Sequence, residues 1–166
     1  MIVDCQNTRW TDLPVPCQQR FFEDYVPGSV CEFGTVQLDE ADIVGFAKQY
    51  DPQNIHADPE AAARGPYHGL IASGWQTASV MMRLLADNYV SKVANMGSPG
   101  IDELRWRLPV RPGDSLSIRI TVLEANRSRS KPYKGVVRSL VEVLNQNQEV
   151  VMSLKSLSMV RCRQTS

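Results

Sequence analysis

The sequence predicts an α+β domain in which a strongly curved antiparallel sheet of about five strands wraps around one long, buried helix. The segment 69–89 repeats apolar residues every three or four positions and has no formal charge before Arg83, which is typical of a helix covered on most sides. Two later segments alternate apolar and polar residues with a period of two, as strands do, and two more strands are expected after them. One earlier strand and one short helix complete the set.

The first 28 residues are expected to form an irregular segment ahead of a single domain that covers residues 29–163. Three prolines and a glycine punctuate this segment and favour turns over regular structure. The first strand of the domain is expected over residues 29–38, where β-branched and aromatic residues are moderately frequent.

A short helix is expected to follow this strand. Asp39 has the side chain and the position of an N-cap, and two acidic residues in the next turn suit the positive end of the helix dipole. Apolar residues continue at helical spacing as far as Tyr50. Pro52 disfavours the helical conformation at the residue before it, so the helix is expected to end at about Asp51.

The long helix is expected to begin at Gly69 and to end at about Tyr89. A glycine at its start suits a place where the backbone comes close to another group. Trp75, Met81 and Met82 lie within the apolar pattern and are interpreted as core residues. The alternative is that some of them line a tunnel for an acyl chain, since soft apolar side chains suit both roles.

Four strands are expected after the long helix. Alternation of apolar and polar residues covers 104–110 and 116–122, with a Pro-Gly-Asp turn between them. The last two strands are expected over 136–144 and 150–160. Because the connections are short, these four strands are expected to form an antiparallel meander.

Composition and charge argue against several classes of function. Eighteen basic residues balance eighteen acidic ones, so the net charge does not point to a nucleic acid or an anionic membrane. No stretch is apolar for long enough to span a bilayer, and the start of the chain lacks the pattern of a secretory signal. The four cysteines form no CxxC pair, which favours a cytoplasmic protein with reduced thiols and no metal or redox motif.

The stretch 50–61 carries the candidate chemistry. Asp51 and His56 lie five positions apart, and these side chains are the two best suited to moving protons at neutral pH. Their spacing alone favours a simpler interpretation, in which Asp51 ends a helix and His56 lies in a surface loop. The other histidine, His68, is interpreted as a structural residue at the entrance to the long helix.

Several motifs together resemble a known family. The segment from Asp51 to Asp58 is similar to the catalytic segment of the MaoC-like dehydratases, the (R)-specific enoyl-CoA hydratases, although Asn54 stands where Pro is common. The run from His68 to Gly74 resembles the His-Gly start of the family's central helix, and the run from Leu108 to Asp114 resembles a strand and turn that follow it. The similarity extends over roughly residues 20–161 and implies the hot-dog fold.

The resemblance implies the reversible hydration of a trans-2-enoyl-CoA to an (R)-3-hydroxyacyl-CoA, a reaction of fatty acid metabolism. Asp51 and His56 would hold and activate the water, with His56 as the main base and Asp51 orienting the water and handling the proton for the α-carbon; how the two share this work is left open. The backbone N–H of Gly69 would donate to the thioester carbonyl oxygen, where enolate charge develops. No metal and no cofactor is expected, since coenzyme A is part of the substrate.

Further residues are expected at the substrate site. Asn54 and Ile55 flank the dyad, and Thr77 lies about two helical turns beyond Gly69, where a hydroxyl group can support the dyad. Arg129 and Lys131 belong to a basic loop that would either attract the phosphates of coenzyme A or remain solvated. An open sheet edge invites pairing, so a homodimer, possibly a higher oligomer, is also expected.

Two other functions remain open. A hot-dog acyl-CoA thioesterase usually carries a catalytic carboxylate on its central helix, whereas this helix has no acid before Asp87. A non-catalytic acyl-CoA-binding module is expected to lose its dyad, whereas both members are present here.

Overall fold

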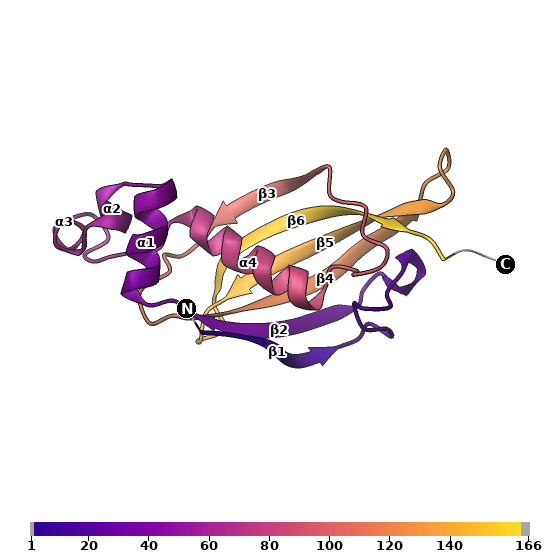
Figure 1. Ribbon diagram of the computed structural model, residues 1–166, viewed down its shortest axis with the longest axis horizontal. Helices are drawn as coiled ribbons and strands as arrows, with labels where there is room; N and C mark the ends of the chain where they lie inside the picture. The colour runs from indigo at the N-terminus through magenta and orange to yellow at the C-terminus, as the bar shows by residue number, and fades with distance from the viewer. Residues whose placement is uncertain (1, 164–166) are drawn as a thin grey trace.

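A computed structural model describes residues 2–163 of the chain, with side chains described from Thr11 onward. All strands in this range join one sheet in the order β1-β2-β4-β5-β6-β3, and the long helix α4 lies across its concave face (Figure 1). The strands are β1 (Ile2–Thr11), β2 (Val30–Gln37), β3 (Gly100–Trp106), β4 (Ser115–Arg127), β5 (Lys134–Leu144) and β6 (Val150–Arg161). The helices are the short 3₁₀ helix η1 (Phe22–Asp24), α1 (Glu40–Tyr50), α2 (Asn54–Ala57), α3 (Pro59–Ala63) and α4 (Gly74–Asn88).

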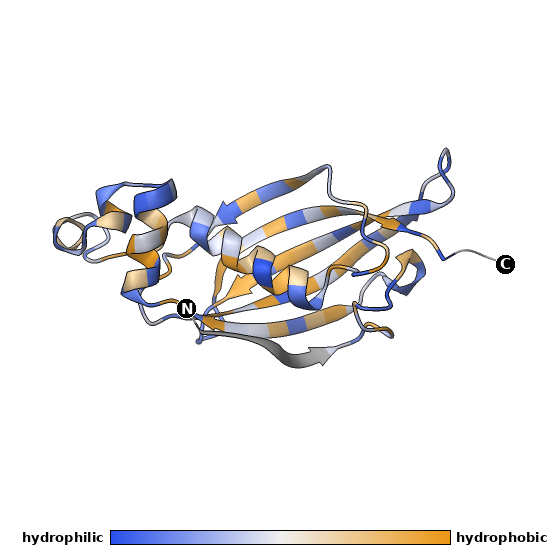
Figure 2. Ribbon diagram, viewed as in Figure 1, coloured by the Kyte–Doolittle hydropathy of each residue, from blue (hydrophilic) through white to orange (hydrophobic). Residues whose placement is uncertain are grey.

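The core lies between α4 and the concave face of the sheet. Apolar residues are interspersed with polar ones along β4, β5 and β6 (Figure 2), and buried residues alternate with partly exposed ones along most of β5. Ile118 lies opposite Val143 and Ile120 lies opposite Val141 on neighbouring strands, and all four are almost completely buried. Leu84 of α4 is also fully buried. The expectation of a curved antiparallel sheet around a long helix is thus confirmed.

The expectation of an irregular segment over residues 1–28 is wrong for its first part. Residues Ile2–Thr11 form β1, which pairs antiparallel with β2 and makes the sheet six-stranded rather than about five-stranded. The three prolines of this region all come after Thr11. They therefore mark the irregular connection between β1 and β2, and they do not argue against a strand over residues 2–11.

The expected four-stranded meander is wrong for β3. This strand pairs with β6 rather than β4, with Gly100 opposite Leu157 and Trp106 opposite Met152, and it forms one edge of the sheet. It also ends at Trp106, before Pro109 and Pro112, because proline has no backbone N–H to donate to a partner strand. Only β4, β5 and β6 form a meander.

The short helix α1 matches the expectation. The Asp39 side chain accepts a hydrogen bond from the backbone N–H of Asp42, with O and N 2.7 Å apart. Ile43 and Ala47 are completely buried and anchor the helix to the core. Asp51 is the C-cap residue, and its N–H donates to the carbonyl oxygen of Ala47 at 2.8 Å. The helix thus fixes the backbone that carries the first candidate catalytic residue.

The long helix begins later than expected, at Gly74 rather than Gly69. Ser73 is its N-cap, and the Ser73 hydroxyl oxygen accepts a hydrogen bond from the N–H of Trp75 at 3.2 Å. Before it, the N–H of Ala72 donates to the carbonyl oxygen of Val110 at 2.8 Å. This bond holds the preceding residues in a non-helical conformation.

One face of α4 is uncovered. Met81 is buried, as expected, whereas Trp75 and Met82 are 57% and 48% exposed. The interpretation of all three as core residues is therefore wrong for Trp75 and Met82. These two residues lie seven positions apart, which places them on the same side of the helix.

Three cysteines, Cys17, Cys31 and Cys162, are buried free thiols, whereas the side chain of Cys5 lies outside the described residues. Over residues 2–163, no helix is both long and apolar enough to cross a membrane. The described side chains also contain no group of three or more His, Cys, Asp or Glu placed to hold a metal ion.

Candidate active site

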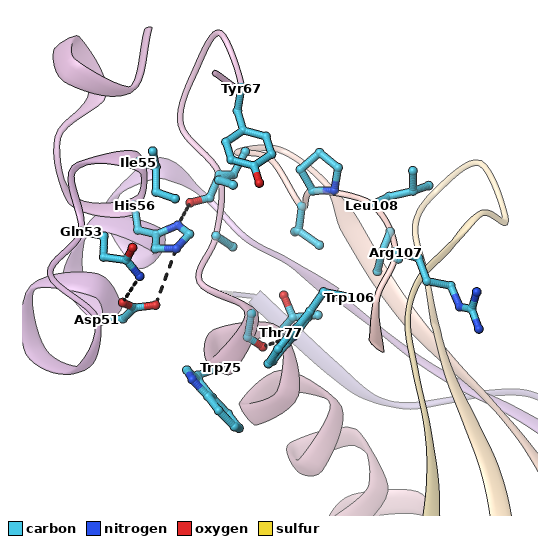
Figure 3. A pocket seen from close by; sticks show the side chains of 16 residues that line it. Asp51, Gln53, Ile55, His56, Tyr67, Trp75, Thr77, Trp106, Arg107 and Leu108 are labelled. Carbon is cyan, nitrogen blue, oxygen red and sulfur yellow. Dashed lines mark hydrogen bonds and ion pairs between the residues drawn. The ribbon is translucent and has the colours of Figure 1, made fainter. Parts of the chain in front are cut away.

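The structure brings Asp51 and His56 together. Asp51 lies at the end of α1 and His56 lies in the single turn of α2, and Nε2 of His56 is 3.6 Å from Oδ2 of Asp51 (Figure 3). The His56 side chain is buried, and Asp51 is partly buried. The acid and the base thus lie on one wall, close enough to act on one small molecule between them.

Two hydrogen bonds fix the orientation of His56. Its backbone N–H donates to the carbonyl oxygen of Gln53 at 2.9 Å, and its Nδ1 lies 2.8 Å from the carbonyl oxygen of Ile71. A carbonyl oxygen can only accept, so Nδ1 carries a proton and the neutral ring has its lone pair at Nε2. These bonds hold His56 although Asn54, rather than Pro, occupies the first position of α2.

Both carboxylate oxygens of Asp51 accept hydrogen bonds. Oδ2 accepts from the Ser73 hydroxyl at 2.6 Å, and Oδ1 accepts from Nε2 of Gln53 at 2.7 Å. The bond from Ser73, followed by the bond from Gln53, lowers the pKa of Asp51 below its ordinary value. Asp51 is therefore ionised at neutral pH.

A cavity of about 390 Å³ opens beside the dyad. This volume is within the usual range for small-molecule sites. Its lining includes Ile55, Ile71, Thr77, Val110 and Val151. Near its mouth, Trp75 and Trp106 meet edge to face, with ring centroids 5.4 Å apart (Figure 3). Asp51 and His56 thus face a cavity whose other walls are mainly apolar.

The expected substrate-site residues Asn54, Ile55 and Thr77 have different surroundings. Ile55 and Thr77 line the cavity, whereas Asn54 is exposed and does not. The Thr77 hydroxyl donates to the carbonyl oxygen of Ser73 at 3.4 Å. It therefore supports the start of α4 and makes no hydrogen bond to the dyad side chains.

Gly69 is not positioned as expected. It lies five residues before the start of α4 and does not line the cavity. Its N–H donates to the carbonyl oxygen of Ala62 at 3.1 Å, so this N–H is already engaged within the chain. Gly74, the first residue of α4, lines the cavity instead.

The basic loop with Arg129 and Lys131 is not near the cavity of the same chain. This loop joins β4 to β5 at the end of the sheet opposite α1, α2 and α3 (Figure 1). Arg107, just after β3, lines the cavity, and its Nε donates to the Ser153 hydroxyl at 3.0 Å. Sequence reasoning missed Arg107 because it appeared only as one polar residue of an alternating strand.

Ser73 and Gln53 are two further site residues that sequence reasoning missed. Gln53 lies two positions after Asp51, and such a small separation is itself a local signal, since the amide of a glutamine can reach back two positions. Ser73 lies 22 positions from Asp51, and nothing local indicates that contact.

The model of the MaoC-like domain family matches residues 24–145 of the chain. The chain belongs to this family. The crystal structure of the MaoC-like dehydratase from Rhodospirillum rubrum is 36% identical, with a TM-score of 0.80 over 88% of this chain and 99% of that one. This likeness confirms the α+β hot-dog fold class for the MaoC-like protein described here.

Two relatives of similar sequence extend the comparison. The uncharacterised protein YdeM of Bacillus subtilis is 27% identical over 76% of this chain and 88% of its own length. The 3-hydroxybutyryl-CoA dehydratase of Methylorubrum extorquens is 32% identical over 63% of this chain. The match spans 64% of that dehydratase, slightly less than two thirds of its length.

Proposed function

We propose that this MaoC-like protein catalyses the reversible hydration of a trans-2-enoyl-CoA to an (R)-3-hydroxyacyl-CoA. The observation that carries the proposal is the 3.6 Å separation between Nε2 of His56 and Oδ2 of Asp51 at the wall of the cavity. A water molecule with hydrogen bonds of about 2.8 Å can reach both atoms. The name of the Methylorubrum extorquens relative, a 3-hydroxybutyryl-CoA dehydratase, supports the same class of reaction.

The lone pair at Nε2 suits His56 to accept a proton from this water. The ionised carboxylate of Asp51 accepts the other hydrogen of the water and so orients its oxygen toward the substrate. The attack places negative charge on the thioester carbonyl oxygen. Gly74 lines the cavity at the first turn of α4, where the positive end of the helix dipole would stabilise that charge.

The cavity suits an apolar acyl chain beside these polar groups. Ile71, Val110 and Val151 offer apolar walls, and burial of an acyl chain against them supplies binding energy in proportion to the area covered. The phosphates of coenzyme A remain outside such a cavity. We assign them to Arg107 at the cavity rather than to Arg129 and Lys131, which lie at the far end of the same chain.

A substrate panel tests the proposal. Short, medium and branched trans-2-enoyl-CoAs are incubated with the protein, and loss of the conjugated enoyl absorbance is followed as kcat/KM. An (R)-specific 3-hydroxyacyl-CoA dehydrogenase then reads the configuration of the product. Hydration with (R) product is expected. No hydration across the panel, an (S) product, or release of free thiol from an acyl-CoA would contradict the proposal, and thiol release would instead indicate a thioesterase.

A further inference from the structure

We propose that Ser73 and Gln53 are positioning residues that keep Asp51 ionised, so that His56 alone carries the proton, from water to its own Nε2 and then to the α-carbon of the substrate. This inference rests on the proposed hydration and assigns the division of labour within its dyad. Asp51 would orient the water and stabilise the imidazolium, and it would not act as an acid.

The Ser73 hydroxyl can play only one role toward Asp51. Its oxygen accepts the N–H of Trp75 at 3.2 Å, as the N-cap of α4, and the same oxygen lies 2.6 Å from Oδ2 of Asp51. A hydroxyl has one hydrogen, and the N–H of Trp75 cannot accept it. The hydrogen therefore points to Asp51. Ser73 is completely buried, so no bulk water competes for this bond.

The second carboxylate oxygen has a donor as well. Nε2 of Gln53 donates to Oδ1 of Asp51 at 2.7 Å. A carboxylate that accepts on both oxygens is stabilised in its charged form, and protonation would remove or weaken at least one of these bonds. The lowered pKa of Asp51 has the same two hydrogen bonds as its leading causes.

No second carboxylate lies beside Asp51 among the described residues that line the cavity. His56 faces it from α2, and Tyr67 and Arg107 line other parts of the cavity. Among the described residues that line this cavity, Asp51 is the only carboxylate. Nothing there repels its negative charge, whereas the imidazolium form of His56 would be attracted by it.

The reaction balances with His56 as the only residue that accepts and donates the proton. An O–H bond of water breaks, its proton goes to Nε2, and the water oxygen bonds to the β-carbon. The electron pair of the carbon–carbon double bond moves toward the thioester carbonyl as an enolate. The proton on Nε2 then bonds to the α-carbon, and His56 returns to its neutral form with Nδ1 still bonded to the carbonyl oxygen of Ile71.

The test uses Gln53→Met, which removes one donor at an exposed position and should leave the fold intact. The carboxyl ¹³C shift of Asp51 is followed against pH by NMR in the wild type and the variant. The midpoint is expected to rise by about one pH unit in Gln53→Met. Gln49→Met, at another exposed position two residues before Asp51, is the matched control and should leave the midpoint unchanged. An unchanged midpoint in Gln53→Met would contradict the first half of the inference.

The rate at neutral pH tests the second half. If protonated Asp51 delivered the proton, a higher pKa would increase its protonated fraction, and kcat/KM of Gln53→Met would rise up to about tenfold. Our inference requires the opposite, a fall of about two- to tenfold in kcat/KM carried by kcat, with KM nearly unchanged. Ser73→Ala should show both effects more strongly, although it also removes a helix cap. If the wild type hydrates no enoyl-CoA, the proposed function fails, and the NMR titration still decides whether Ser73 and Gln53 hold Asp51 ionised.

Discussion

The indole N–H of Trp106 donates a hydrogen bond to the carbonyl oxygen of Gly74, with N and O 2.9 Å apart. This bond joins the edge strand β3 to the first turn of α4, beside the cavity that Asp51 and His56 line. The Trp106 ring lies so close to the helix that a Cβ atom on Gly74 would be 2.4 Å from it. The close packing of Trp106 against α4 therefore requires a glycine at position 74.

We expect Gly74→Ala to lower the free energy of unfolding by about 1–3 kcal/mol, because either the Trp106 ring or the helix must move to admit the methyl group. Urea denaturation measures the change. Gly45→Ala is the matched control, since Gly45 lies in α1 with no atom within 4 Å of an added Cβ. There the substitution should stabilise the helix by up to about 1 kcal/mol. Equal stability of Gly74→Ala and the wild type would contradict the close contact.

We expect Arg20→Met to destabilise the protein by about 2 kcal/mol or more, because it removes two hydrogen bonds that a buried guanidinium donates. Arg20 is 2% exposed, and its guanidinium donates to the carbonyl oxygens of Val15 and Tyr89 at 2.9 and 2.7 Å. It thereby fixes the connection between β1 and β2 against the end of α4. Thermal unfolding measures the effect, and Arg129→Met in the exposed basic loop should change stability by less than about 0.5 kcal/mol.

We expect the stability of the fold to decrease above about pH 10. Burial raises the pKa of Tyr89 well above its ordinary value, and burial also raises that of Tyr25. As pH rises, these two phenols therefore ionise at a lower pH in the unfolded chain than in the folded protein. The stability that comes from keeping a buried phenol neutral is complete below the ordinary pKa of tyrosine. It is lost as the pH rises from that value toward the higher pKa of the tyrosine in the folded protein.

Tyr89→Phe isolates one of these groups. The variant loses the hydrogen bond between the Tyr89 hydroxyl and Ser139, 2.9 Å long, so it should be about 1 kcal/mol less stable at neutral pH. It should also lose less stability than the wild type between neutral pH and about pH 10.5. Urea denaturation at the two pH values measures both effects, with the exposed Tyr133→Phe as the control. Parallel pH dependence in wild type and Tyr89→Phe would show that Tyr89 is not responsible.

We expect the protein to form a homodimer through β3. This strand forms one edge of the sheet and exposes Ile101 and Trp106, which are 50% and 48% accessible. An exposed edge with apolar side chains favours pairing with another strand. Light scattering should show a dimer for the wild type and a shift toward monomer for Ile101→Lys. Val26→Lys, at a similarly exposed position away from this edge, should remain dimeric, and a monomeric wild type would contradict the expectation.

The parts of the site that depend on neighbouring residues could be predicted from the sequence. Asp39 caps α1 within its own first turn, and Pro52 ends the helix at the residue before it. Asp51 and His56 are separated by one bend and a single turn of α2, so their meeting follows from a short stretch of chain. Short-range sterics and hydrogen bonds decide all of these features.

The parts that depend on distant segments could not be predicted. The period-two pattern of β3 is the same whether it pairs with β4 or with β6, and only the assembled sheet selects β6. The residues before Gly74 are as apolar as the helix itself, and their non-helical conformation depends on a hydrogen bond from the N–H of Ala72 to the carbonyl oxygen of Val110. The contact between Ser73 and Asp51 arises only once α1 and the start of α4 are packed together.

The most direct test of the central claim compares the hydration of crotonyl-CoA by the wild type, Asp51→Asn and His56→Gln, each of which replaces the titratable group with an uncharged amide. We expect kcat/KM to fall at least about 100-fold in both variants, the usual range for loss of a general base or its partner, with circular dichroism unchanged. His68→Gln, which alters the other histidine, should retain activity within about twofold of the wild type. Wild-type activity in both folded dyad variants would contradict the account.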